Sequence, residues 1–526
     1  MQNTAERNAK CSMIWKERWL TMKWIKAIFV TSTASVFVAT AAQSADLPMK
    51  AKAIEYVCTA YGAGYYYIPG TDTCVKIGGY VRFEAYYNAP QGAYPVNNAT
   101  GVFNRHVNAF AMQSRFRLTM DARTQTEYGT LRSYLNFGVN ARNGINQSLA
   151  PSISVALERA FIQFAGFTIG RSQTFFTLYN SSSWGLITAT LDGGTASTGM
   201  NLAAYTWQLG GGLSSTLSFE DAQAHSKGVV DLGNAAAAGN TAGVLGAAPF
   251  TSTNTSDSQG ARAPDIVGNL RVDQAWGSAQ IMGALHQVSA RYNFNTSTAT
   301  CNGAGNNTTA CGHPGEKWGW AIGAGMTLKM PWDSKDTLSG QIAYSKGASS
   351  YVAFANSNNA LHQSGGIALG AFNDAVFGGV GLNGGGISEI ELTEAWGGSI
   401  AFQHYWTPSL RTSWVFGYMS VQYGEAAKVL IANLGNRCIG SGIVISDTAS
   451  CDPDWSTWRV SSRTMWNPVR NLDVGVEVAY TQVDTAFGGA TGTLTTPNNG
   501  LSIGSYALDD LGVWSAALRV HRSFWP

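Results

Sequence analysis

Apolar and polar residues alternate strictly along residues 71–87, TDTCVKIGGYVRFEAYY. From residue 75 onward, one face receives Val75, Ile77, Val81, Phe83, Ala85 and Tyr87, and the other receives Lys76, Tyr80, Arg82, Glu84 and Tyr86. Successive side chains of a β-strand point to opposite faces, so this pattern predicts a strand with one apolar face. Soluble sheets and membrane barrels both use such strands, and the rest of the chain must decide between them.

The same period of two recurs along the chain, with short connections alternating with long ones. The predicted strands are Thr71–Tyr87, Ala109–Arg123, Thr130–Ala141, Ile153–Ala165, Phe167–Ser172, Asn201–Leu209, Leu213–Asp221, Asp265–Val272, Ala275–Ser289, Lys317–Lys329, Thr337–Lys346, Trp396–Trp406, Leu410–Tyr423, Thr457–Trp466, Leu472–Gln482 and Leu511–Phe524. Toward the C-terminus, the polar faces include Arg459, Arg463, Glu477 and Arg519. Alternating short turns and long loops are typical of an outer-membrane barrel.

Composition favours a membrane barrel. The 526 residues include 60 glycines and 11% aromatic residues, but only 13% are charged, about half the share in an ordinary soluble domain. Mean hydropathy is −0.05, and no stretch after residue 44 approaches the roughly 20 consecutive apolar residues of a spanning helix. A barrel combines these features because only alternate residues face lipid.

The cost of burying charged groups decides which face of each strand meets lipid and which meets water. If the face carrying arginine, aspartate and glutamine were a dry core, each unpaired charge would cost several kcal/mol. If that face lines water and the apolar face meets lipid, the penalty disappears. The sequence therefore predicts an all-β fold, a transmembrane antiparallel up-and-down β-barrel.

Residues 1–44 are predicted to be a signal peptide. Lys23 and Lys26 precede an apolar run at 27–42 that is too short to span a membrane, and Ala-Gln-Ser at 42–44 suits cleavage before Ala45. Met22 is a more natural initiator than Met1, and the alternative for this region is an N-terminal anchor helix. We expect residues 45–70 to be a periplasmic segment and residues 71–526 to form the barrel.

Loss of the leader removes six basic and two acidic residues and changes the formal net charge from +2 to −2. With a net charge this close to zero, the chain lacks the concentrated basic face that nucleic-acid binding requires.

Six of the seven cysteines follow the leader in three close pairs, Cys58 with Cys74, Cys301 with Cys311, and Cys438 with Cys451. An even number suits an oxidising compartment, so we predict three local disulfides. Their spacings are not those of zinc ligands, and His313 is interpreted as a loop histidine.

Five segments of the chain resemble the general porins of alphaproteobacterial outer membranes. They are C-x-x-YGAGYYYIPGTDTCVKIGGYVR at 58–82, ADLPMKAK at 45–52, RAFIQFAGFTIGRSQTFF at 159–176, PDIVGNLRVDQAWGSAQ at 264–280, and the closing strand with Leu518, Arg519 and Phe524. The resemblance implies an outer-membrane homotrimer of barrels with about 16 strands each, which pass small hydrophilic solutes and ions by diffusion. It also implies that residues from Thr174 to about Met200 fold into the lumen as the third loop. The strand boundaries above, which give sixteen strands, lean on this resemblance.

The candidate functional site is the lumen wall. Five inward arginines, Arg82, Arg115, Arg117, Arg132 and Arg159, cluster on the first four predicted strands, together with Glu84. The third loop offers one carboxylate opposite them, Asp192. Opposite charges across a narrow channel create a transverse field that favours polar solutes. In the alternative interpretation, each arginine pairs with Glu84, Asp121 or Glu158 and braces the wall. The basic excess predicts a mild preference for anions.

The function that we expect is a water-filled diffusion channel without a catalytic step, cofactor or metal. The chain contains no G-x-S-x-G, H-E-x-x-H or Walker motif. His286, His404 and His521 lie on different predicted strands, and the sequence assigns them no carboxylate partners. One alternative is a surface-exposed barrel that acts as an adhesin or binding protein through its long loops. Another is a secreted soluble β-solenoid or sandwich.

Overall fold

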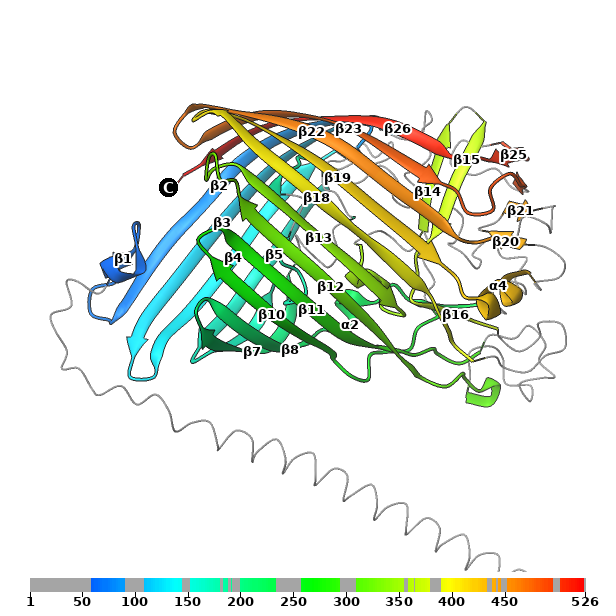
Figure 1. Cartoon of the computed structure of the whole chain (residues 1–526), viewed down its shortest axis with the longest axis horizontal. Helices are drawn as coiled ribbons and strands as arrows, with labels where there is room; N and C mark the ends of the chain where they lie inside the picture. Colours follow the sequence, from blue (N-terminus) through cyan, green and yellow to red (C-terminus); the bar gives the residue numbers. More distant parts are fainter. Residues whose placement is uncertain are drawn as a thin grey trace, which may run out of the picture. The chain divides into compact units, whose positions relative to one another are not determined.

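A computed structural model describes residues 58–89, 108–143, 152–179, 183–187, 191, 199–232, 257–293, 309–353, 358–363, 365–378, 389–432, 438–440, 443–445, 452–494 and 502–524. The predicted leader, Asp192, Cys301 and Cys451 lie outside these ranges. Within them, a 17-stranded antiparallel sheet dominates the fold (Figure 1). One of its strands is the short β1 (Tyr66–Tyr67), and the other sixteen form a barrel.

The barrel strands are β2 (Thr73–Tyr87), β3 (Phe110–Thr126), β4 (Gly129–Arg142), β5 (Ser152–Phe164), β6 (Phe167–Ser172), β7 (Met200–Gly210), β8 (Leu213–Glu220), β10 (Asp265–Gln274), β11 (Gly277–Val288), β12 (Lys317–Lys329), β13 (Thr337–Lys346), β18 (Glu394–Thr407), β19 (Leu410–Gln422), β22 (Trp455–Val469), β23 (Leu472–Asp484) and β26 (Leu511–Ser523). Each pairs with its neighbours in chain order, and β26 pairs with β2 to close the ring. All sixteen predicted strands are present, with ends that differ from the prediction by a few residues.

The outer surface of the barrel is apolar. On adjacent strands, Ile281, Ile322, Ile342 and Ile400 are each about half exposed and point away from the lumen. Exposed tryptophans lie near both strand ends, Trp406 and Trp466 toward the short turns, Trp396 and Trp514 toward the long loops. Such belts mark the two interfaces of a membrane, and short turns mark its periplasmic side.

Replacement of Ile342 by arginine tests the assignment of the outer face. Ile342 lies in the middle of β13 and is 57% exposed, so the substitution would place a charge in hydrocarbon. The expected loss of stability is about 2 to 4 kcal/mol, measured by denaturant unfolding of the barrel from lipid vesicles. Ile342→Leu is the control and should unfold like the unmodified protein. Equal stability of the arginine variant would contradict a lipid-facing position.

The long connections pack into a core of their own, which we call the loop core. Its fully buried residues include Tyr351, Leu361, Phe372, Phe487 and Leu508. Its members include residues of η7 (Ser349–Tyr351), β14 (Asn358–Gln363), β15 (Gly366–Ala371), β16 (Ala375–Phe377), α4 (Glu425–Ala432) and β25 (Gly504–Leu508), and β9 (Val229–Asp231) packs against it. The long connections also contain α2 (Ala222–His225), β17 (Glu391–Leu392), β20 (Cys438–Gly440), β21 (Ile443–Ile445) and β24 (Thr491–Leu494). None of the helices in the described residues is both long and apolar enough to cross a membrane.

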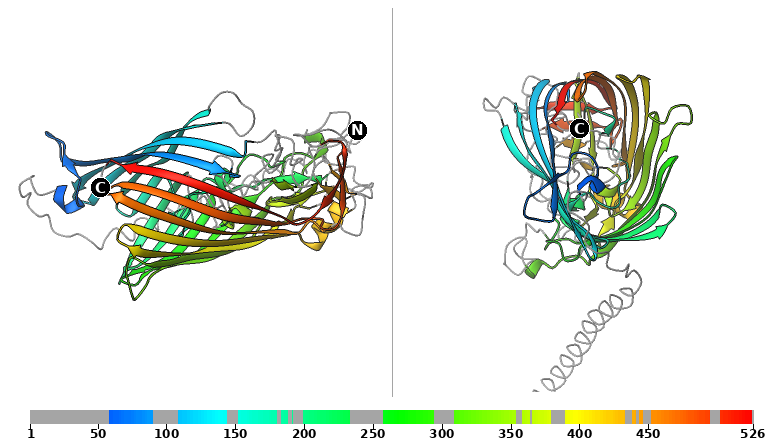
Figure 2. Two further views of the ribbon diagram at one scale, coloured as in Figure 1. Left: turned by 90° about the horizontal axis from the view of Figure 1, so that it is seen from above. Right: turned by 90° about the vertical axis from the view of Figure 1, so that its left-hand side faces the viewer.

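The loop core lies against one side of the inner wall. Its barrel residues belong to β10–β13, β18, β19, β22, β23 and β26, and include Ala321, Ala343, Ala395, Met419 and Val483. At these positions the inward side chains pack against the folded loops rather than against water. Figure 2, in its end-on view, shows chain segments inside the ring of strands.

Tight packing of β15 against β22 makes Gly370 sensitive to substitution. A Cβ atom at Gly370 would lie 2.0 Å from the indole of Trp455, whose Nε1 donates to the carbonyl of Ala371 at 2.7 Å. Gly370→Ala is expected to cost about 1 to 3 kcal/mol by overpacking and to make the β13–β18 connection susceptible to limited proteolysis. Gly504→Ala is the matched control, because nothing lies within 4 Å of its added carbon. Unchanged proteolysis of Gly370→Ala would contradict this packing.

Candidate functional site

After β6 the chain turns inward and follows the inner wall. We call its described residues, 174–179, 183–187 and 191, the inward segment. Its first part is held through its backbone at Phe175, whose N–H donates to Glu220 on β8 at 2.9 Å and whose carbonyl accepts from Asn269 on β10 at 2.7 Å. Farther on, Gln341 on β13 accepts from the N–H groups of Leu178 and Tyr179 at 3.0 and 3.3 Å.

The second part is held at the other side of the barrel by Glu477 on β23. This buried carboxylate accepts hydrogen bonds from the backbone N–H groups of Leu186 and Ile187, the latter at 2.9 Å. It also pairs with Arg459 on β22 at 2.9 Å. Wall side chains also donate to backbone carbonyls of the inward segment. Arg463 donates to Ser183 at 3.0 Å, Ser413 to Trp184 at 2.9 Å, Arg519 to Leu186 at 3.2 Å and Arg459 to Ile187 at 3.4 Å. The wall thus holds the segment by its main chain.

Small residues on the wall make room for this close approach. A Cβ atom at Gly325 would lie 3.3 Å from Cβ of Leu178, and one at Gly417 would lie 3.1 Å from Cβ of Leu191. Contacts of 3.0–3.4 Å are tighter than most real Cβ contacts, so larger wall residues would push the segment into the lumen. Glycine at these inward positions therefore sets how near the segment lies to the wall.

Glu220 also connects the inward segment to the loop core. Its second oxygen lies 3.2 Å from Nε2 of His225, and the His225 ring stacks on Tyr351 with centroids 4.0 Å apart. The Tyr351 hydroxyl donates to Asp265 at 2.7 Å, and burial followed by the nearby Asp265 raises its pKa well above the usual value. Glu220, His225 and Tyr351 thus form a continuous chain of contacts between the start of the inward segment and the loop core.

The predicted basic cluster lies on the opposite arc of the wall, from β2 to β5. Arg82 and Arg115 face each other across β2 and β3. Arg82 lies 3.5 Å from Glu84, which is nearly inaccessible and also pairs with Arg519 at 2.6 Å. One buried carboxylate therefore serves two arginines at the seam between β2 and β26.

Two further carboxylates pair with wall arginines. Arg117 pairs with Glu158 at 2.7 Å, and Asp121 pairs with both Arg132 and Arg123, at 2.8 and 2.9 Å. For Arg82, Arg117 and Arg132, the structure thus has the contacts of the alternative hypothesis, in which arginines brace the wall.

Arg115 and Arg159 differ from the other predicted arginines, as does Arg142 on β4. Among the described residues, none of the three forms an ion pair with a carboxylate. Arg159 donates to the carbonyl of Glu158 at 2.7 Å, and Nε of Arg115 and of Arg142 has no hydrogen-bond partner. These three guanidinium groups lack the close carboxylate contact that the other predicted arginines have.

The whole arc carries an excess of positive charge. Its described inward side chains from β26 to β5 include nine basic groups, Lys76, Arg82, Arg115, Arg117, Arg123, Arg132, Arg142, Arg159 and Arg519, and three acidic ones, Glu84, Asp121 and Glu158. The described part of the inward segment contains no acidic residue, and Asp192 lies outside the described residues. The charges described in the lumen are therefore mostly wall charges.

Two histidines have carboxylate partners that the sequence did not assign. His286 lies 2.8 Å from Asp265 below the loop core, and His404 lies 2.7 Å from Asp336 at the short-turn end. The two pairs lie at opposite ends of the barrel and do not form one site. No group of three or more histidine, cysteine, aspartate or glutamate side chains in the described ranges is arranged to hold a metal ion.

Comparison with known proteins places this barrel in a family. A family model described as a porin subfamily matches residues 46–501. The chain belongs to this porin family. Porin Omp2b of Brucella abortus (strain 2308) is 30% identical to this porin over 264 residues, which cover 48% of the chain and 64% of the Brucella protein. The match therefore spans slightly less than two thirds of that relative's length. Omp2b of Brucella melitensis biotype 1 is 29% identical over the same length.

A solved structure shows a similar fold. The outer membrane channel DcaP of Acinetobacter baumannii matches this porin with a TM-score of 0.50 and 16% identity, over 87% of this chain and 99% of DcaP. At that identity the likeness concerns the fold alone. Together with family membership, it identifies a multi-pass β-barrel of the Gram-negative outer membrane.

Proposed function

We propose that this porin forms a water-filled channel for passive diffusion of small hydrophilic solutes and ions, without an enzymatic step. The observation that carries the proposal is the polar arc of β2–β5, which lies outside the loop core and faces an inward segment held against the far wall. Charged groups in this arrangement are compatible with a membrane protein only if they line water. The family match supports the same function.

We assign the constriction to the region between the inward segment and the arginines of β2–β5. Arg115, Arg142 and Arg159 provide positive charge and form no close ion pair with a described carboxylate, which supports a preference for anions. Arg82, Glu84, Arg117 and Arg132 line and brace this region, and Asp192 is retained as an expected lining residue. When charges of one sign line a channel with low-dielectric walls, they raise the local concentration of ions of the opposite sign.

The adhesin alternative receives no support from the described loops. Their large apolar side chains, such as Phe372 and Phe487, are fully buried in the loop core rather than presented to a partner. The homotrimer remains a proposal that rests on the resemblance to general porins. It would be tested by the mass of the detergent-solubilised protein before and after heating.

The channel itself is tested by single-channel recording in planar lipid bilayers. Stepwise ohmic openings are expected from the folded protein, and the reversal potential across a salt gradient should have the sign of anion preference. Correctly folded protein that never conducts would refute the channel, and a cation-selective reversal potential would refute the assigned constriction.

A further inference from the structure

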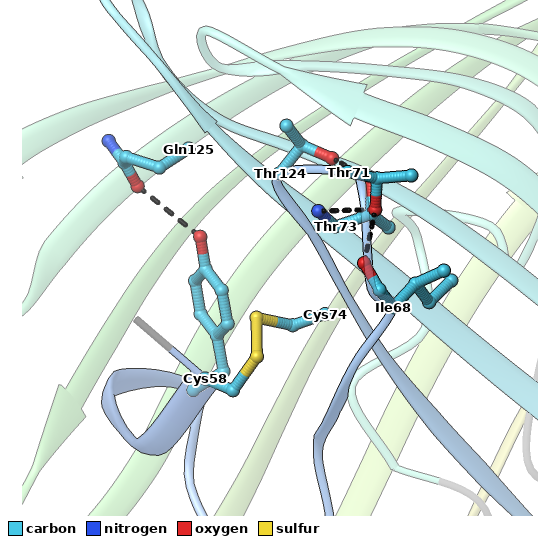
Figure 3. Close-up of a disulfide and its surroundings, with 8 residues drawn as sticks. Cys58, Ile68, Thr71, Thr73, Cys74, Thr124 and Gln125 are labelled. Carbon is cyan, nitrogen blue, oxygen red and sulfur yellow. Dashed lines mark hydrogen bonds between the residues drawn. A yellow bond between two sulfur atoms is a disulfide. The ribbon is translucent and has the colours of Figure 1, made fainter. Parts of the chain in front are cut away.

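The residues before the first barrel strand form a closed loop at the short-turn end. We call Cys58–Thr73 the strap. It begins with the helical turn η2 (Cys58–Tyr61) and returns through β1, which pairs with β2 in the register Tyr66 with Val75. A disulfide joins Cys58 to the fully buried Cys74 on β2 (Figure 3). The strap is thus fixed to the barrel at both ends.

The contacts of the strap place it on the lumen side of the wall. Lys76 donates to the carbonyl of Ala63 at 3.1 Å, and the Tyr61 hydroxyl donates to Gln125 at 3.4 Å. Arg123 lies against the ring of Tyr61, 5.5 Å from its centroid. Lys76, Arg123 and Gln125 all belong to the polar, inward-facing set of β2 and β3. In the end-on view of Figure 2, the blue helical turn lies within the outline of the barrel mouth.

The strap also covers basic groups that would otherwise face the channel exit. Arg123 lies 5.0 Å and Lys76 lies 5.9 Å from the ring centroid of Tyr65. Burial and a hydrogen bond with Asp121 raise the pKa of Tyr65 to about 12, so its hydroxyl is neutral across physiological pH. Cation–π contacts of this kind contribute about 0.5 to 1 kcal/mol each at exposed sites. Without a covalent link, these contacts and the two-residue pairing of β1 with β2 would hold the strap only weakly.

Backbone conformation allows the strap to bend back over β2. Gly62 and Gly64 have φ angles of +97° and +87°, which glycine adopts without the steric cost that other residues pay. They flank Ala63, whose carbonyl receives Lys76. The bend and the disulfide together position the two tyrosines over the wall.

We infer that the strap is a second restriction of this porin, at the periplasmic end of the channel, and that the Cys58–Cys74 disulfide holds it in place. This inference rests on the proposed channel function. With the disulfide intact, the strap narrows the exit and shields Lys76 and Arg123 from passing ions. When the bond is reduced to two thiols, the strap moves off the mouth, the exit widens, and the uncovered basic groups strengthen the preference for anions.

The experiment adds a phosphine reductant to the periplasmic side of folded channels already inserted in a planar bilayer. The phosphine takes up an oxygen atom from water and becomes its oxide, and the disulfide gains two electrons and two protons. We expect single-channel conductance to rise roughly 1.5-fold and the reversal potential to move further toward the equilibrium potential of the anion. Unchanged conductance and reversal potential, with both thiols shown by alkylation and mass measurement to be free, would overturn the inference.

Two variants separate the strap from other effects of the reductant. The double variant Cys58→Ser, Cys74→Ser should start at the raised conductance and should not respond, although the disulfide at Cys311 remains reducible in it. A response equal to that of the unmodified protein would assign the effect to another disulfide and overturn the inference. The double variant Tyr61→Ala, Tyr65→Ala keeps the disulfide and should show a partial rise in single-channel conductance. Absence of any conductance before reductant is added would instead refute the channel itself, and the strap with it.

Discussion

Replacement of Glu477 by glutamine is expected to detach the middle of the inward segment and to enlarge the channel. The Glu477 carboxylate accepts from two consecutive backbone N–H groups, Leu186 and Ile187, and balances the charge of Arg459. Glutamine keeps the shape but turns one acceptor into a donor and leaves the arginine unpaired. Breaking a buried pair in this way costs about 3 to 5 kcal/mol. Single-channel conductance should rise, its noise should increase, and the barrel should unfold at lower temperature.

Asp473→Asn is the matched control for this substitution. Asp473 lies on the same strand and pairs with Arg411 at 2.8 Å, but this pair is about one-fifth exposed at the short-turn end and does not contact the inward segment. Surface pairs contribute about 0 to 1 kcal/mol, so conductance and noise should stay close to those of the unmodified protein. If Glu477→Gln also conducts normally and quietly, the carboxylate does not hold the segment.

Replacement of Arg115 and Arg159 by glutamine is expected to reduce the preference for anions. Neither guanidinium forms a close ion pair with a described carboxylate, so both are expected to contribute positive charge to the lumen potential. The anion-to-cation permeability ratio should fall roughly threefold in the double variant. The difference should shrink between 0.1 M and 1 M salt, because the Debye length falls from about 10 Å to about 3 Å. The measurement is the reversal potential across a salt gradient.

Arg271→Gln is the control for charge removal alone. Arg271 is exposed at the end of β10 and already pairs with Asp273 at 2.8 Å, so its loss should leave the permeability ratio nearly unchanged. An equal effect of Arg271→Gln and the double variant would show that selectivity reflects total charge rather than the arc of β2–β5.

The barrel was predictable from sequence because its signal is local. Each strand alternates lipid-facing and inward-facing residues, so the position of Ile342 or Glu477 follows from the residues beside it. The folded loops were not predictable in this way. Strand β15, GIALGA, is buried at every position, and a strand covered on both faces has no period of two. Its small residues therefore suggest a loop, although they are required for packing inside the barrel.

The site was predictable only in part for a related reason. Periodicity placed Arg82, Arg117, Arg459 and Glu477 on the polar face, but not the group that each contacts. The partners of Glu477 are backbone N–H groups at residues 186 and 187, nearly 300 positions away. Backbone groups carry no sequence signature, so only the path of the inward segment reveals them. The pair of Arg132 with Asp121 joins the neighbouring strands β3 and β4, and the pair of Arg117 with Glu158 spans from β3 to β5 across β4. Both were accessible to prediction as one of two hypotheses.

Closure of the barrel has a consequence for its biogenesis. The seam joins β2 to β26, with Tyr80 opposite Ser523, so the ring cannot be completed until the chain as far as β26 has been delivered. Contacts this distant in sequence form slowly. Until they form, two unpaired strand edges and a lipid-facing apolar surface stay open to aggregation. Chaperones that shield this unfinished chain in transit are therefore a requirement of the topology itself.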